Sequence, residues 1–415
     1  MTDDALRIDP QRLFARLDAL AQVGAIDGGG CCRLALTDDD RRGRDLVVRW
    51  MRELDLAVSI DAIGNVFGLR AGRTQAAPVM TGSHIDTVRT GGRYDGNLGV
   101  LAGLEVLQTL DDASIVTERP LVVAFFTDEE GARFPPDMLG SLVYVGDMPL
   151  AEALDVRAID GARLGDELAR IGYAGSAAPG VHRPHAFVEL HIEQGPVLDA
   201  EGVTIGAVQD LQGISWQQLT VTGQSNHAGT TPMRLRHDAG YAAAAVAGYV
   251  RELAREMGGS QVGTVGKIDL HPNLINVIAA RATLTVDLRN IDEARLREAE
   301  ERLAVFLAQL ASDEGVTIET RSLARFEPVR FDAGVVARIE AVASSLGLSH
   351  RRMTSGAGHD AQMLARICPT AMIFVPSVQG ISHNPAEHTE AVDLAAGANV
   401  LLHTLLGLAN DSPIT

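Results

Sequence analysis

Short apolar runs that end on polar residues, separated by stretches of helical spacing, leave few folds open to this chain. APVMTGSHID and PLVVAFFTDEE predict buried strands with polar carboxyl ends. NLGVLAGLEVLQTL between them has the apolar spacing of a helix, and TDDDRRGRDLVVRWMREL predicts another, with Thr37 as its N-cap. This β–α–β order predicts an α/β fold. We expect a mostly parallel sheet flanked by helices, with reactive groups beyond the carboxyl ends of the strands.

The pattern changes between residues 213 and 330. Strands are predicted at ISWQQLTVTG, TVGKIDLHP, ARATLTVDLRN and VTIETRSLARF, and helices at DAGYAAAAVAGYVRELAREM and DEARLREAEERLAVFLAQL. The resulting order, βαββαβ, is typical of a ferredoxin-like α+β unit. The α/β pattern then returns, with the strand AMIFVPS and a last helix from about Glu390. We therefore expect one domain made of residues 1–212 and 331–415, with a smaller domain, residues 213–330, inserted as a lid on hinges near residues 212 and 330.

Composition fits a soluble enzyme and disfavours some partners. A chain of 415 residues is long enough for two domains. The formal charge of −18 argues against nucleic acid and against an anionic membrane as main partners. No uninterrupted apolar run reaches the length of a membrane span, and the acidic N-terminus lacks the apolar core of a secretory signal.

The cysteines indicate a reducing compartment. Cys31 and Cys32 are adjacent and Cys368 is distant, which is neither a disulfide framework nor a thiolate zinc site. We therefore expect a cytoplasmic protein. Lys267 is the single lysine, so chemistry that needs a catalytic lysine has one candidate.

Five polar segments follow separate apolar runs and carry imidazole or carboxylate groups. They are TGSHIDTV with His84 and Asp86, GGRYDGNLG with Asp95, TDEEG with Glu129 and Glu130, VELHIEQG with His191, and ISHNPAEHT with His383. Each residue alone is more often a hydrogen-bonded loop residue than a ligand. Together they fall where an α/β sheet collects its reactive groups. Imidazole and carboxylate without thiolate suit zinc, manganese, cobalt or nickel.

The adjacent carboxylates Glu129 and Glu130 predict two different partners. Neighbouring side chains on an extended backbone point to opposite faces, so we expect one carboxylate on a cation and the other free to move protons. Two divalent cations that share Asp95 would acidify a water molecule between them. Asp86 lies two positions after His84, and we expect its side chain to accept the far ring N–H of His84.

These segments resemble the hydantoinase/carbamoylase family of amidases. The resemblance rests on GSHIDTV, YDGNLGV, TDEEGARF, HIEQGPVL, SNHAGTTPM, SGAGHDAQ and ISHNPAEHT, which follow the family's order through nearly the whole chain. That family belongs to the clan of dinuclear aminoacylase- and carboxypeptidase-like metallohydrolases. The resemblance implies two divalent metal ions per subunit and a homodimer formed through the inserted domain.

The resemblance also implies roles for single residues. His84, Asp95 and His191 would hold one metal, and Asp95, Glu130 and His383 the other. Glu129 falls on the family's general base. In the inserted domain, His227 matches the histidine that polarises the scissile carbonyl, and Asn276 with Arg289 match the pair that binds the substrate carboxylate. Gln194, Gly358 and His359 are expected to line the substrate pocket.

The expected activity is hydrolysis of an N-carbamoyl-L-amino acid to the amino acid, carbon dioxide and ammonia. Allantoate amidohydrolase and β-ureidopropionase are the rival activities, because they share the ligands and a carboxylate-binding Arg. A ligand-binding relative without catalysis is disfavoured, since Glu129 and every ligand are present. A Ser–Ser–Lys amidase is disfavoured too, because Lys267 stands in a predicted strand without accompanying serines. From the residues alone, Arg289 could equally be paired on the surface, and His227 could hydrogen-bond locally.

Overall fold

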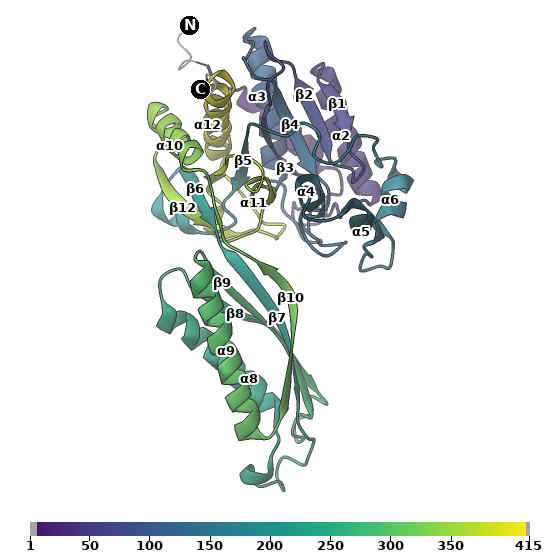
Figure 1. Cartoon of the computed structure of the whole chain (residues 1–415), viewed down its shortest axis with the longest axis vertical. Coiled ribbons are helices and arrows are strands. Elements are labelled where there is room, and N and C mark those ends of the chain that lie inside the picture. Colours follow the sequence, from purple (N-terminus) through teal and green to yellow (C-terminus); the bar gives the residue numbers. More distant parts are fainter. Residues whose placement is uncertain (1–5, 412–415) are drawn as a thin grey trace. The chain divides into compact units, whose positions relative to one another are not determined.

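The computed structural model describes residues 6–411 and separates the chain into two compact units. The larger unit comprises Met1–Gln209 and Phe331–Thr415, and the inserted unit comprises Asp210–Arg330. Each unit has its own sheet and its own helices (Figure 1).

The sheet of the larger unit is mixed. Its strands are β1 (Ala57–Ile60), β2 (Val66–Arg70), β3 (Val79–His84), β4 (Leu121–Phe126), β5 (Ala186–Ile192), β6 (Ile205–Leu211), β12 (His350–Ser355) and β13 (Thr370–Val375). The two-residue strand β11 (Val329–Arg330) falls in the range of the inserted unit but pairs with β6 of this sheet. The order is β1-β2-β4-β3-β5-β13-β6-β11, with β12 beside β6. The α/β class is confirmed. The central strands β4, β3, β5 and β13 run parallel to one another, and β1, β2, β6 and β11 add antiparallel pairs.

Helices surround this sheet. They are α1 (Pro10–Ala21), α2 (Asp38–Glu53), α3 (Asn97–Asp112), α4 (Leu139–Val145), α5 (Leu150–Asp155), α6 (Leu164–Ile171), α7 (Val197–Glu201), α10 (Ala333–Ser345), α11 (Asp360–Leu364) and α12 (Ala391–Asn410). Thr37 caps α2 as predicted, its side chain accepting the Asp40 N–H. By length and composition α12 is apolar enough to cross a membrane, yet most of it is buried as a core helix. Strands β3, β5 and β13 end close together, which sets the place of the site.

The inserted unit has the predicted ferredoxin-like topology. Its elements are β7 (Gly213–Thr222), α8 (Ala239–Met257), β8 (Val262–His271), β9 (Arg281–Asn290), α9 (Glu293–Glu314) and β10 (Thr317–Phe326), with a short 3-10 turn, η2, at Met233–Leu235. The antiparallel order is β10-β7-β9-β8. Inward residues of β9, such as Leu284 and Leu288, share one core with Val246 of α8 and Leu303 of α9.

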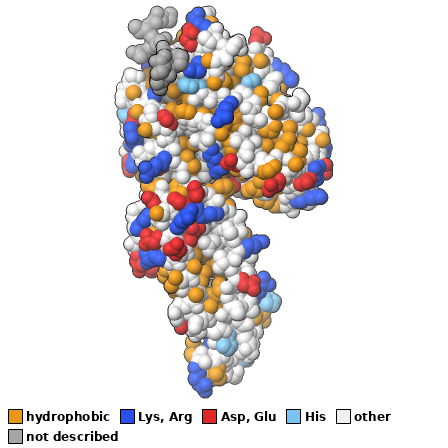
Figure 2. Space-filling model, in the orientation of Figure 1, with side chains coloured by type: hydrophobic (Ala, Val, Ile, Leu, Met, Phe, Trp, Pro, Cys, Tyr) orange, Lys and Arg blue, Asp and Glu red, His pale blue; other side chains and the backbone are white. Residues whose placement is uncertain are grey.

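The surface of the inserted unit carries mixed charges rather than a patch of one sign. Figure 2 shows acidic and basic side chains gathered over it near the first turns of α9. There, Arg325 pairs with Glu293 at 2.7 Å and with Glu300 at 2.8 Å, and Arg297 also pairs with Glu293 at 2.7 Å. Half-exposed pairs of this kind contribute little each to stability.

Candidate metal centre

Two buried histidines of neighbouring strands present the same ring nitrogen to the site. His84 is the last residue of β3, and its Nδ1 lies 2.9 Å from the backbone oxygen of Asp86. His191 stands near the end of β5, with Nδ1 2.8 Å from the backbone oxygen of Ile192. A carbonyl can only accept, so both rings donate from Nδ1 and turn Nε2 toward the site.

Asp95 stands between these rings and a third histidine. Its Oδ1 lies 3.2 Å from Nε2 of His191 and 3.7 Å from Nε2 of His84. Its Oδ2 lies 3.3 Å from Nε2 of His383. Because the two oxygens face different imidazoles, one carboxylate is shared by two groups of ligands. His84, Asp95 and His191 form the first group; Asp95, Glu130 and His383 form the second.

Glu129 and Glu130 do face different partners, but not because they alternate on a strand. Strand β4 ends at Phe126, and Asp128 has a φ of 56°, so the chain bends before the two carboxylates. Glu129 Oε2 lies 3.4 Å from Nε2 of His84, and Glu130 Oε2 lies 3.4 Å from Nε2 of His383. The expectation of an extended backbone is therefore wrong.

Asp86 supports this bend and the orientation of His84 with different atoms. Its carboxylate accepts the backbone N–H groups of Glu129 and Glu130, at 3.3 Å each. The His84 ring instead bonds to the Asp86 backbone oxygen. The predicted side-chain contact is thus replaced by a main-chain one, because the carboxylate turns toward the β4 loop.

The geometry of these groups fits divalent cations. Two ligands of a tetrahedral ion with bonds of about 2.1 Å lie about 3.4 Å apart, and the separations above run from 3.2 to 3.7 Å. Neutral rings would aim Nε2 lone pairs at the oxygens of Asp95, which is favourable only with a cation between them. Buried oxygens Oε1 of Glu130 and Oε1 of Gln194 have no hydrogen-bond partner among the described residues.

The pKa values show how strongly the groups act on one another. Burial works against the ionised form of Asp95, but hydrogen bonds from three imidazoles outweigh it and hold the pKa of Asp95 well below its usual range. The Asp95 carboxylate raises the pKa of His383 to about 9. Burial, then the charge of Asp95, raises the pKa of Glu130 to about 8. Burial also raises the pKa of Glu129 well above its ordinary value.

Of the three expected pocket residues in the larger unit, Gln194 reaches the ligands directly. Its Nε2 donates to Asp95 Oδ2 at 2.9 Å. His359 does not meet Asp95; its ring packs 4.5 Å from that of His191, centroid to centroid, and its Nε2 lies 3.1 Å from Ser355 Oγ. At Gly358 an added Cβ would lie 2.4 Å from Met138 Cε, so the position is crowded.

His227 and Asn276 lie side by side in the inserted unit. The Asn276 backbone oxygen accepts the Ala228 N–H at 2.9 Å. Nδ1 of the exposed His227 accepts the N–H groups of Gly229 at 3.0 Å and Thr230 at 3.3 Å. The neutral ring therefore carries its proton on Nε2, which is a hydrogen-bond donor.

Arg289 stands at the other end of the same unit. Asn276 follows β8, whose last residue, His271, is opposite Arg281 at the start of β9, whereas Arg289 is near the end of β9. The strand between Arg281 and Arg289 spans about 27 Å. Asn276 and Arg289 of one copy therefore do not converge. Arg289 also pairs with Asp287 at 2.9 Å, the surface pairing that the residues alone left open.

Sequence reasoning missed several residues that shape the site. Gly96 has a φ of 66°, and an added Cβ would lie 2.4 Å from the His84 ring. Arg33 is fully buried and donates to the Ile85 backbone oxygen and to Asn97 Oδ1, next to the ligand-bearing segments. Glu387 accepts the N–H groups of Tyr94 and Asp95. Of Gly96, Arg33 and Glu387, only Gly96 stands next to a predicted ligand, Asp95, in the sequence.

Comparison with known proteins identifies the family of the chain. The profile of Peptidase family M20/M25/M40 matches residues 80–407. An N-carbamoyl-L-amino-acid amidohydrolase of Rhizobium meliloti is 42% identical, over 97% of each chain. An allantoate amidohydrolase of Escherichia coli is 37% identical, over 96% of this chain and 98% of the relative. A crystal structure of a hydantoinase/carbamoylase family amidase from Burkholderia multivorans superposes with a TM-score of 0.94 at 46% identity, covering 98% of this chain and 99% of that one. The chain therefore belongs to peptidase family M20/M25/M40, in its hydantoinase/carbamoylase branch of amidases.

Proposed function

We propose that this protein hydrolyses N-carbamoyl-L-amino acids. Water adds to the carbamoyl carbon, the bond to the amino-acid nitrogen breaks, and the released carbamic acid decomposes to carbon dioxide and ammonia. The observation that carries the proposal is the sharing of Asp95 by two groups of ligands, with Glu129 beside His84. The activity named for the Rhizobium meliloti relative supports the choice of substrate.

The family consists of enzymes that bind divalent metals, and we propose two such ions per subunit. His84, Asp95 and His191 would hold one ion, and Asp95, Glu130 and His383 the other. Zinc fits the nitrogen and oxygen ligands, and manganese, cobalt and nickel accept the same set. When bound, the ions supply Lewis acidity and lower the pKa of a water molecule.

The protein's own groups handle protons and substrate charge. We assign Glu129 to take a proton from the attacking water and to pass it to the leaving nitrogen. The Nε2–H of His227 would donate to the carbamoyl oxygen as negative charge develops there. Arg289 and Asn276 would bind the substrate carboxylate, for which a guanidinium offers two parallel hydrogen bonds. Gln194, Gly358 and His359 would line the pocket.

We propose a homodimer that pairs through the inserted unit. The edge strand β8 is long and carries exposed apolar side chains, among them Ile268 and Leu270. Such an edge invites pairing with a second copy. The separation of Asn276 from Arg289 also supports a dimer, because two copies offer both residues to one substrate. We place the enzyme in the cytoplasm, since Cys31, Cys32 and Cys368 are free thiols.

A substrate panel tests the assignment. Zinc- or manganese-loaded protein is incubated with several N-carbamoyl-L-amino acids, N-carbamoyl-β-alanine and allantoate, and ammonia release is measured. We expect the highest kcat/KM on an N-carbamoyl-L-amino acid. Release from allantoate alone would make the protein an allantoate amidohydrolase, as its Escherichia coli relative is named. Activity that survives exhaustive chelation would refute the metal centre itself.

A further inference from the structure

Glu387 connects two loops that carry metal ligands. It is buried in the segment between His383 and α12. Its Oε1 accepts the backbone N–H groups of Tyr94 at 3.1 Å and Asp95 at 3.2 Å. Its Oε2 accepts the hydroxyl of Ser382 at 3.1 Å. One carboxylate therefore bonds to the residue Asp95 itself and to the residue before His383.

The side chain of Glu387 is closely packed in this arrangement. A Cβ added at Gly92 would lie 2.1 Å from Cδ and Oε1 of Glu387, so glycine is required there for space. Thr90 Oγ1 donates to the His383 backbone oxygen at 3.2 Å, a second link between the same two loops. The backbone at His383 itself is unusual, with a φ of 53°. A segment held in this conformation depends on its neighbours to stay there.

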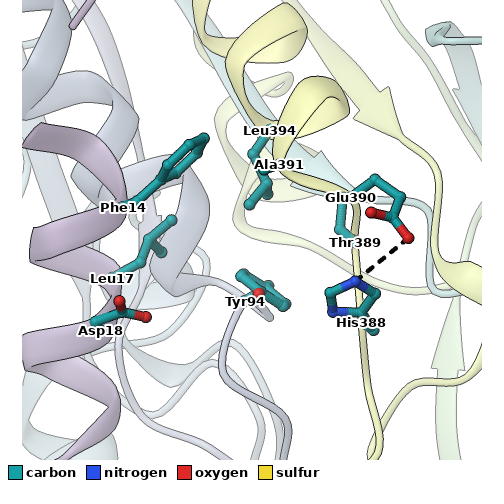
Figure 3. Close-up of a pocket in the computed structure, with 9 residues that line it drawn as sticks. All are labelled: Phe14, Leu17, Asp18, Tyr94, His388, Thr389, Glu390, Ala391 and Leu394. Carbon is teal, nitrogen blue, oxygen red and sulfur yellow. Dashed lines mark ion pairs between the residues drawn. The ribbon is translucent and has the colours of Figure 1, made fainter. Parts of the chain in front are cut away.

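Packing alone does not fix the outer side of the Asp95 loop. Tyr94 and His388 border a cavity of about 240 Å³, whose other walls include Phe14 and Leu17 of α1 and Leu394 of α12 (Figure 3). A loop beside a cavity lacks the contacts that hold a close-packed core in place. The carbonyl oxygens of Tyr94 and Asp95 accept the Leu98 and Asn97 N–H groups at 2.9 and 2.7 Å, whereas Glu387 holds the N–H groups of the same two residues.

We propose that Glu387 is a positioning residue, which holds the loops of Asp95 and His383 at the spacing that their shared cation requires. This inference rests on the metal centre proposed above. The group formed by Asp95, Glu130 and His383 depends on Glu387 through two of its ligands, and the group formed with His84 and His191 through Asp95 alone. Loss of Glu387 thus weakens the first group more than the second.

The test compares Glu387→Ala with Glu387→Gln in the full-length protein. The first readout is hydrogen–deuterium exchange of the Tyr94 and Asp95 amides without metal, and the second is zinc affinity by chelator competition. In E387A we expect faster exchange at both amides and a loss of about 10–100-fold in zinc affinity at one site. In E387Q the amide oxygen still accepts both N–H groups and its NH₂ faces Ser382, so affinity stays within about threefold.

Glu390→Ala is the matched control, because Glu390 lies in the same segment but is exposed, with its carboxylate 3.5 Å from Nε2 of His388. It should leave both readouts unchanged. If E387A fails to fold, Gly92→Ala decides, since its methyl group displaces the carboxylate without removing it and should reproduce both effects. The positioning role alone would be overturned if E387A had the same amide exchange and zinc affinity as the wild type. If E387A does not fold, the same result in G92A would overturn it. Wild-type protein that binds no zinc would overturn the metal centre and this role together.

Discussion

At the scale of single residues, Glu129 differs from Glu130 by its partner. Both are buried carboxylates, but Glu129 faces His84 of the first ligand group and Glu130 belongs to the second. Glu130 belongs to a ligand group and Glu129 does not. A carboxylate that does not hold a cation is free to exchange a proton. On this ground we propose Glu129 as the base.

Glu129→Gln should therefore abolish turnover while zinc content stays the same. Glutamine keeps the shape of the side chain but cannot take a proton, and loss of a general base costs about 10²–10⁴-fold in kcat. Steady-state kinetics and metal analysis of the same samples check this. Turnover within tenfold of wild type would show that another group is the base.

Gly96 is the second prediction at this scale. Gly96→Ala adds a methyl group 2.4 Å from the His84 ring, at a φ of 66°. Gly146 also has positive φ, at 90°, but nothing lies within 4 Å of its added Cβ, so Gly146→Ala is the control for backbone strain. We expect G146A, in the left-handed region, to lose about 1–2 kcal/mol of stability. G96A should lose more, because its ψ of −46° lies outside that region and its methyl group meets the His84 ring, and G96A alone should lose zinc affinity. Equal affinities in the two variants would contradict the collision with His84.

At the scale of elements, the hairpin of β1 and β2 contains a buried acid, Asp61, that is not part of either ligand group. Asp61 accepts the N–H groups of Ile63 at 3.2 Å and Asn65 at 2.9 Å, and the side-chain amide of Asn65 at 2.9 Å. Burial nevertheless dominates and raises the pKa of Asp61 to about 6. The turn therefore favours a protonated Asp61.

The sign of the resulting pH effect follows from proton binding. Between pH 4 and pH 6 the folded protein holds a proton on Asp61 that the unfolded chain has released, so the free energy of unfolding falls as pH rises. The contribution lost by pH 7 is about 3 kcal/mol. Unfolding of wild type and Asp61→Asn at pH 4 and pH 7 measures it, with the exposed Asp55→Asn as control. If the free energies of unfolding of wild type and D61N differed by the same amount at both pH values, the raised pKa of Asp61 would be contradicted.

At the scale of the whole molecule, the residues of the inserted unit that we propose to bind the substrate lie at opposite ends of that unit. His227 and Asn276 lie beyond the end of β8, and Arg289 lies at the far end of β9. A dimer can bring the first pair from one copy and Arg289 from the other to a single substrate. The proposed activity then belongs to the dimer.

Mixing two inactive variants tests this. Asn276→Ala and Arg289→Ala should each lose most of their kcat/KM. Random exchange of subunits makes half of the dimers mixed, and each mixed dimer has one intact set, so activity returns to about a quarter of wild type. A mixture of N276A with His227→Ala is the control, because both changes lie at the same end of the unit and no intact set forms. If the mixture of N276A with R289A regained no activity although subunit exchange was demonstrated, a site shared between copies would be contradicted.

The strands with polar ends, the inserted βαββαβ unit and the imidazole and carboxylate groups of the candidate site could be predicted from the sequence, because these depend on local periodicity and on side-chain chemistry. How these parts contact one another could not be predicted from it. The tertiary structure placed the Asp86 backbone oxygen, not the carboxylate, on His84, set Glu387 on the Asp95 loop, and kept Asn276 apart from Arg289. Such contacts depend on backbone atoms and on strand lengths, and they join residues that are distant along the chain. The spacing of side chains in the sequence does not indicate them.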